Sequence, residues 1–155
     1  MTRKTCFFTG HRKLSDKKTP KIITNLNKEI DYLIQKGVTT FMSGGVLGFD
    51  QLAAWLIVSK KQAGANIRLV FALPCRNQEE KWTFSQRQRY NLLLLEADEV
   101  HCISERYSPG CMKRRNRYMV ENSQYCIVLT NRITGLGETV RYANEKGLSV
   151  INVAQ

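Results

Sequence analysis

Residues 43–50 read SGGVLGFD, with three glycines and an aspartate between an apolar stretch and an amphipathic one. Glycine lacks a Cβ atom, so the N–H groups of such a loop can approach a phosphate closely. The first N–H groups of a following helix have no intrahelical partners and favour an anion at the same place. The loop is therefore a candidate phosphate- or ribose-binding turn, in which Asp50 either caps the helix or accepts a ribose hydroxyl. Its candidate residues are Ser43, Gly44, Gly45, Gly48 and Asp50.

Glycines that serve only the turn and close helix packing would explain the same loop. The segment is neither a Gly-x-Gly-x-x-Gly fingerprint nor a Walker P-loop. A second glycine-rich stretch, TGLGETVRYA, strengthens the ligand-binding interpretation and adds the candidates Gly135, Gly137 and Thr139.

Two other segments carry candidate side chains. In TGHR, Thr9, Gly10 and Arg12 follow an apolar run, and the guanidinium of Arg12 has the geometry to clamp a phosphate. A surface arginine is the alternative, and the neighbouring His11 is interpreted as a loop residue more readily than as a general base. In MKRRNRY, Arg115 and Asn116 are candidates, although helical spacing prevents Arg115, Asn116 and Arg117 from sharing one face.

These segments fall where apolar runs give way to amphipathic ones. Apolar runs predict strands at 5–10, 38–43, 66–74, 99–104, 125–130 and 148–154. Helical patterns occupy 22–34, 52–57, 77–96, 111–122 and 135–147. Strands that are apolar throughout and alternate with helices are typical of a parallel sheet covered on both faces. We expect one doubly wound, Rossmann-like α/β domain over residues 1–155, with ligands outside the carboxyl ends of the strands.

The amino-acid composition limits the kinds of partner that this protein is expected to bind. A net charge of +11 favours anions such as nucleotides, nucleic acid or acidic protein surfaces, and MKRRNRY is the densest basic cluster. No apolar stretch is long enough for a membrane span and no secretory signal is present, so a cytoplasmic protein is expected. The five cysteines and two histidines complete no zinc spacing, and no metal is expected.

Five motifs in the same order resemble the YpsA-like family of the SLOG superfamily, which is related to the Smf/DprA and LOG proteins. They are CFFTGHR, SGGVLGFDQLAA, FALPCRNQEEKW, GCMKRRNRYMVENSQYCIVL and TVRYANEKG, and the resemblance extends from about residue 4 to residue 153. It implies a Rossmann-like fold, an ADP-ribose- or NAD-like ligand, and a role in bacterial cell division or stress responses. By position it places Thr9, Gly10 and Arg12 in the family's first motif, Gly44, Gly45, Gly48 and Asp50 in its glycine loop, and Arg115, Asn116 and Met119 in its basic helix.

One loop departs from the family pattern. Relatives have Gly-Gly-Thr before the TVRYA helix, whereas this chain has Gly135, Leu136 and Gly137, which removes a hydroxyl group. LOG enzymes cleave nucleoside monophosphates with an arginine and a glutamate. Val140 and Arg141 stand where their acidic pair would be, and Glu138 lies about two residues early. A phosphoribohydrolase is therefore a weaker alternative than a nucleotide-binding sensor or regulator.

Single-stranded nucleic-acid binding is a third function class. The charge supports it, and Trp82, Phe84 and Tyr90 could offer bases a stacking surface. No helix-turn-helix, zinc-finger or aromatic RNA-binding signature is present, so this alternative ranks below a small nucleotide ligand. A homo-oligomer is expected only by analogy with SLOG proteins.

Overall fold

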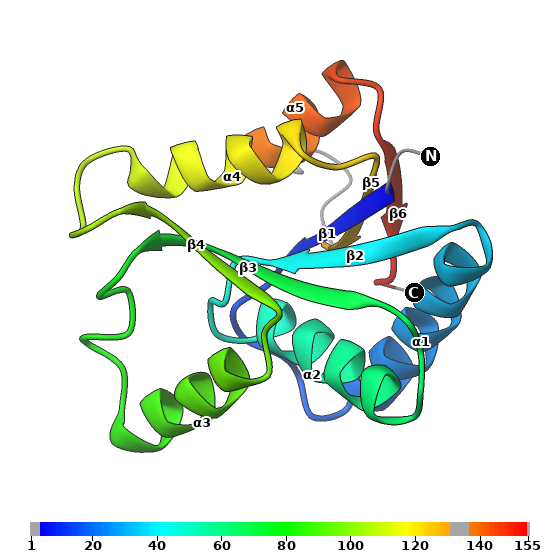
Figure 1. Ribbon diagram of the computed structural model, residues 1–155, viewed down its shortest axis with the longest axis horizontal. Coiled ribbons are helices and arrows are strands. Elements are labelled where there is room, and N and C mark those ends of the chain that lie inside the picture. The colour runs from blue at the N-terminus through cyan, green and yellow to red at the C-terminus, as the bar shows by residue number, and fades with distance from the viewer. Residues whose placement is uncertain (1–3, 131–136, 155) are drawn as a thin grey trace.

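Strands and helices alternate along the whole of the computed structural model, which describes residues 4–130 and 137–154 (Figure 1). The elements are β1 (Lys4–Gly10), α1 (Thr19–Gln35), β2 (Val38–Ser43), α2 (Phe49–Gln62), β3 (Arg68–Cys75), α3 (Phe84–Leu95), β4 (Glu99–Ser104), α4 (Cys111–Glu121), β5 (Tyr125–Leu129), α5 (Gly137–Glu145) and β6 (Ser149–Asn152). The predicted order of strands and helices is therefore confirmed.

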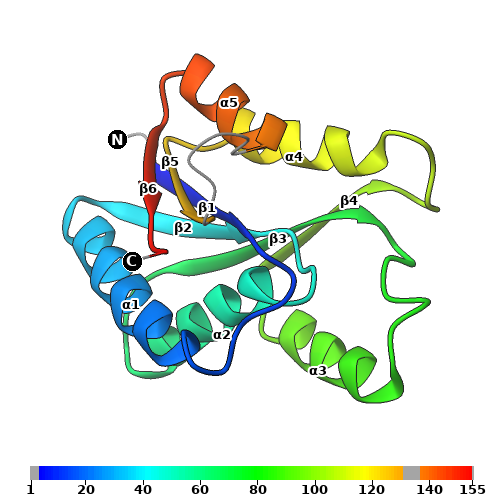
Figure 2. The ribbon, with the colours of Figure 1, turned by 180° about the vertical axis from the view of Figure 1, so that it is seen from behind.

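The six strands form one parallel sheet in the order β4-β3-β2-β1-β5-β6. Helices α1, α2 and α3 cover one face, and α4 and α5 cover the other (Figures 1 and 2). β1 lies inside the sheet, and the order of the strands reverses beside it. This is the doubly wound, Rossmann-like arrangement that the sequence predicts.

Two apolar layers explain why the strands lack polar alternation. Phe8 and Phe41 pack toward α1 and α2, with Phe49 of α2 edge-on against Phe8 at 6.4 Å between ring centroids. The neighbouring Phe7 points to the opposite face and joins the layer that contains Met119 of α4. Because successive strand residues serve both layers, each strand is apolar throughout.

Two predicted boundaries are wrong. The third strand continues through Pro74 to Cys75, which lies beside Ser104 in β4. The helix predicted over 77–96 begins only at Phe84, because Thr83 and Gln86 form a reciprocal capping box that starts it there. None of the described helices is both long and apolar enough to cross a lipid bilayer.

Candidate functional site

The loop between β2 and α2 is pressed against the segment that follows β1. Gly48 has φ = +87°, a conformation that L side chains rarely adopt. A Cβ atom at Gly48 would lie 2.5 Å from the main-chain oxygen of His11 and would also collide with Arg12. The same His11 oxygen accepts a 3.0 Å hydrogen bond from Phe49 N–H. Gly48 thus serves close packing between the two loops.

Buried polar groups fold this loop back on itself. The Ser43 hydroxyl donates to the Asp50 main-chain oxygen at 3.0 Å and accepts from Gly45 N–H at 3.2 Å. The side-chain amide of Gln51 donates to the Gly45 carbonyl at 3.0 Å. The loop is therefore held in shape by its own hydrogen bonds.

Asp50 lies beneath the loop with only 4% of its surface exposed. Its carboxylate accepts hydrogen bonds from the main-chain N–H groups of Gly44 and Val46. Its Oδ1 atom, however, has no hydrogen-bond partner among the described residues. Burial raises its pKa to about 7, against the lowering effect of the positive charges on Arg115 and Arg12. Asp50 is thus a buried acid that exchanges its proton near neutral pH.

Arg115 of α4 reaches across the sheet edge to the same loop. Its Nη1 atom donates to the carbonyl oxygens of Gly44 at 2.8 Å and Ala72 at 3.2 Å, and Nε donates to Asn116 Oδ1 at 2.8 Å. A Cβ atom at Gly44 would lie 2.5 Å from Nη1. The arginine is 3% exposed, and burial lowers its pKa while the Asp50 charge opposes that shift. It therefore joins α4 to β2 and β3 from inside the protein.

A cleft of about 570 Å³ opens beside this loop, at the carboxyl ends of β1 to β4. It brings two cations and two aromatic rings together with side-chain amides and one carboxylate. The residues that line it are Arg12, Val46, Leu47, Pro74, Cys75, Asn77, Gln78, Glu80, Lys81, Trp82, Tyr107 and Met112. We call this space the β-end cleft.

The wall of the β-end cleft is built by Gln78, which the sequence did not nominate, and by two of the expected stacking residues, of which Trp82 lines the cleft and Tyr90 is buried behind it. Gln78 donates to the Gly44 carbonyl at 3.2 Å and to the Tyr90 hydroxyl at 2.9 Å. The Trp82 ring packs edge-on against Tyr90, with 5.1 Å between centroids. Tyr90 is fully buried, and desolvation raises its pKa, so its hydroxyl stays protonated.

The loop after β4 is tied to the same wall. Asn77 Oδ1 accepts Tyr107 N–H at 3.2 Å, which leaves the Tyr107 ring 68% exposed at the rim of the cleft. Arg76 and Glu105 form an ion pair at 2.8 Å and also share a main-chain hydrogen bond. Two loops about 30 residues apart in sequence therefore make one surface.

The structure does not gather all of the nominated residues at one place. Arg12 lines the β-end cleft, and Ser43, Gly44, Asp50 and Arg115 lie buried next to it. Thr9 and Gly10 end β1, and a Cβ atom at Gly10 would lie 2.7 Å from the Phe49 ring.

A second group of nominated residues lies elsewhere. Asn116 and Thr139 line a separate pocket of about 150 Å³ between α4 and α5, where Gly137 begins α5. Glu138 lines this pocket as well and pairs with Lys113 at 3.0 Å and Arg117 at 3.5 Å. Gly135 and Leu136 fall outside the described residues.

The motifs and the fold agree with one protein family. The family model described as "YspA SLOG family", named YpsA, matches residues 6–145. The chain belongs to this YpsA family of SLOG proteins. Its glycine loop, β-end cleft and Arg115 all lie within the matched residues.

Two curated bacterial proteins are similar in sequence to this YpsA-family chain. It is 29% identical to the SPbeta prophage-derived protein YoqJ of Bacillus subtilis over 146 residues, which is 86% of this chain and 81% of YoqJ. It is 33% identical over 104 residues to a UPF0398 protein of Halalkalibacterium halodurans, a match that covers 66% of this chain and 55% of the relative. The chain thus spans little more than half the length of that UPF0398 relative.

Two solved structures share the fold of this YpsA-family chain. DNA processing protein A (DprA) of Streptococcus pneumoniae superposes with a TM-score of 0.54 at 14% identity, over 99% of this chain and 60% of DprA. DprA of Helicobacter pylori gives a TM-score of 0.54 at 16% identity, over 99% and 77% of the two chains. At these identities the likeness supports a Rossmann-like fold alone.

Proposed function

We propose that this protein binds a nucleotide or a nucleotide derivative, such as an ADP-ribose- or NAD-like molecule, in the β-end cleft. In this proposal it acts as a cytoplasmic sensor or regulator rather than as a hydrolase. The observation that carries the proposal is the joint presence of cations, aromatic rings and side-chain amides around one cleft of about 570 Å³. Pockets for small ligands commonly have volumes of roughly 300–1,000 Å³.

Each part of a nucleotide has a chemical counterpart in the cleft. A base can stack on the Tyr107 ring at the rim or on Trp82, because aromatic faces attract one another when offset. Arg12 and Lys81 supply positive charge for phosphates, and the guanidinium of Arg12 can bind two oxygens at once. Glu80 is able to accept ribose hydroxyls. The packing of Gly48 against the Arg12 backbone sets the base of the arginine side chain beside the loop.

Binding is preferred to hydrolysis because of where Glu138 lies. The glutamate is ion-paired with Lys113 and Arg117 at the smaller pocket, and it does not line the β-end cleft. Glu80 is the carboxylate at the cleft surface, and its hydrogen bond from Asn77 at 3.1 Å points to a role in shaping the wall.

Isothermal titration calorimetry with AMP, ADP, ADP-ribose, NAD and inorganic phosphate tests the proposal. We expect at least one nucleotide to bind the wild type and Arg12→Gln to weaken that binding about tenfold, as loss of a charge-assisted contact should. Arg117→Gln, at the smaller pocket, is the matched control and should leave binding unchanged. Absence of binding to every nucleotide, or an equal loss in both variants, would contradict the proposal.

Single-stranded DNA is the second candidate ligand. It is favoured by the net charge of +11 and by two aromatic rings beside cations in the cleft. DprA of H. pylori, which shares the fold, binds single-stranded DNA in a unique mode. Fluorescence anisotropy of a labelled oligothymidine at several salt concentrations separates the candidates. Tight binding that weakens steeply with salt, without competition from mononucleotides, would favour DNA.

A further inference from the structure

Helix α3 carries an apolar stripe on its outer side. Phe84 is 67%, Leu92 56% and Leu95 81% exposed, whereas Tyr90 and Leu93 on the inner side are buried. At 100° per residue, positions 84, 88, 92 and 95 fall within about 80° of one another. The stripe therefore runs the length of the helix, with Gln88 as its single polar member. Figures 1 and 2 show α3 at the periphery, beside α2.

Exposed apolar side chains are ordinary when scattered singly over a surface, but three aligned on one helix are not. Side chains this exposed contribute little to the core of this chain. An aligned apolar row with an i, i+4, i+8, i+11 spacing matches what one helix presents to another. The shape of the stripe thus favours a helical partner.

The charges around the stripe determine how a second copy of this chain could bind there. The helix and its C-cap residue, 84–96, hold Arg87, Arg89 and Glu96 and so carry one net positive charge in a chain of net charge +11, while Asp98 and Glu99 beyond them are already paired with Lys61 and Arg68. Two copies of so basic a protein repel each other over most of their surfaces. A second copy must therefore be held at α3 by charges that pair across the contact.

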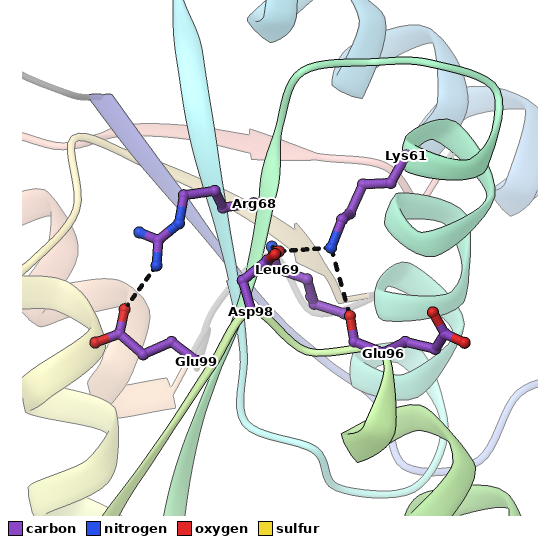
Figure 3. Close-up of polar contacts among 6 residues, drawn as sticks. All are labelled: Lys61, Arg68, Leu69, Glu96, Asp98 and Glu99. Atoms are coloured by element: carbon purple, nitrogen blue, oxygen red, sulfur yellow. Dashed lines mark hydrogen bonds and ion pairs between the residues drawn. The ribbon is translucent and has the colours of Figure 1, made fainter.

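Arg89 and Glu96 make this face complementary to itself. They are seven residues apart, so they lie about 20° from each other on one flank of the stripe. Both are exposed, and neither forms an ion pair with another described residue. The main-chain oxygen of Glu96 accepts a hydrogen bond from Lys61 Nζ at 3.4 Å, and the Glu96 carboxylate points away from that contact (Figure 3).

The position of Glu96 in its own helix is unfavourable. It is the C-cap residue of α3, where the partial negative charge of the helix end repels a carboxylate. An antiparallel partner helix would bring the N-terminal half of that helix, with its Arg89, to this carboxylate. The two-fold symmetry would form the same pair twice, as in isologous dimers.

We propose that α3 packs antiparallel against α3 of a second copy of this chain, with Leu92 near the two-fold axis and Arg89 of each copy paired with Glu96 of the other. The apolar stripe provides the contact, and the two ion pairs set its direction. The proposal is independent of any ligand in the β-end cleft.

Sedimentation velocity over a concentration series reaching several hundred micromolar tests this dimer. We expect a reversible monomer–dimer equilibrium in the wild type. Leu95→Asp should abolish it, while Tyr32→Asp, at an exposed aromatic residue on α1, should leave it unchanged. Far-ultraviolet circular dichroism confirms that each variant is folded.

A charge swap tests the pairing itself. Arg89→Glu or Glu96→Arg alone places like charges across the axis and should raise the dimer dissociation constant about tenfold. The double variant Arg89→Glu/Glu96→Arg restores the pairs and should return the constant to near its wild-type value. A wild type that stays monomeric throughout the series, or a double variant no better than the single ones, would overturn the proposal.

Discussion

The guanidinium of Arg115 donates a 2.8 Å hydrogen bond to the main-chain carbonyl of Gly44, which lies 71 residues earlier in the chain. Because the same nitrogen also reaches Ala72, this one side chain joins α4 to the ends of β2 and β3. The glycine is needed at position 44 because any Cβ atom would displace the guanidinium. A loop with the composition of a phosphate cradle is thus built around a protein cation.

Arg115→Ala should destabilise the protein by about 3 kcal/mol, since it removes a buried donor from the carbonyl oxygens of Gly44 and Ala72 and a neutralising positive charge from the side of Asp50. Urea denaturation at pH 7 measures the loss. Lys113→Ala, two residues earlier on α4, removes a surface ion pair and should cost less than about 1 kcal/mol. Equal losses in the two variants would show that the buried bonds contribute little.

Gly48→Ala should be far more destabilising than Gly64→Ala. Both glycines have positive φ, +87° and +102°, so alanine strains the backbone at each. A Cβ atom meets backbone atoms of His11 and Arg12 at position 48, but nothing within 4 Å at position 64. We expect an additional loss of about 2 kcal/mol or more at Gly48, measured as the difference in urea midpoints. Similar midpoints would contradict the tight packing of the two loops.

Asp50 should make stability fall as the pH rises. Its pKa is about 7 in the folded protein and near 3.8 when unfolded, so between these values the folded state binds more protons. Relative to Asp50→Asn, the free energy of unfolding of the wild type should decline from pH 4 to pH 8, by at most about 4 kcal/mol. A difference that does not change with pH would mean that the buried carboxylate is ionised throughout.

Asp98 should have the opposite pH dependence. Partial burial favours its neutral form, but hydrogen bonds from Lys61 at 2.6 Å and Leu69 N–H at 2.7 Å outweigh that effect and lower its pKa (Figure 3). Its contribution is present above the unfolded pKa near 3.8 and is lost as the pH falls through the folded value. Because a third of the side chain is exposed, Asp98→Asn should cost only about 1 kcal/mol at pH 7, and progressively less below pH 4. Chemical denaturation of the wild type and Asp98→Asn at pH 7 and below pH 4 measures this difference, with Glu105→Gln as a surface control.

The sequence predicted the sheet because its strands are buried on both faces. Runs such as TCFFTG lack polar alternation for the reason that Phe7 and Phe8 enter different apolar layers. The helix predicted from residue 77 begins too early, because Thr83 and Gln86 form a capping box that starts α3 at Phe84. Polar residues before Thr83 continue a helical pattern in the sequence, whereas the capping box sets the actual start of the helix.

The candidate site was harder to predict than the fold. Tyr107 meets the wall near Gln78 through a hydrogen bond to Asn77, a contact between two irregular loops that periodicity does not encode. The sequence does contain a pattern that predicts the inward direction of the Arg115 side chain. Cys111, Arg115 and Met119 follow one another at intervals of four on α4, and all three are buried.

The position of β1 inside the sheet has a consequence for folding during synthesis. β1 pairs on one side with β2, the next strand in the chain, and on the other with β5, which is synthesised much later. Thr5 N–H, for example, finds the Gln124 side chain 119 residues later, at 2.8 Å. A nascent chain that ends before β5 therefore has one open, apolar strand edge, which other chains can join. Completion of the sheet depends on this long-range closure, which should make it a slow folding step.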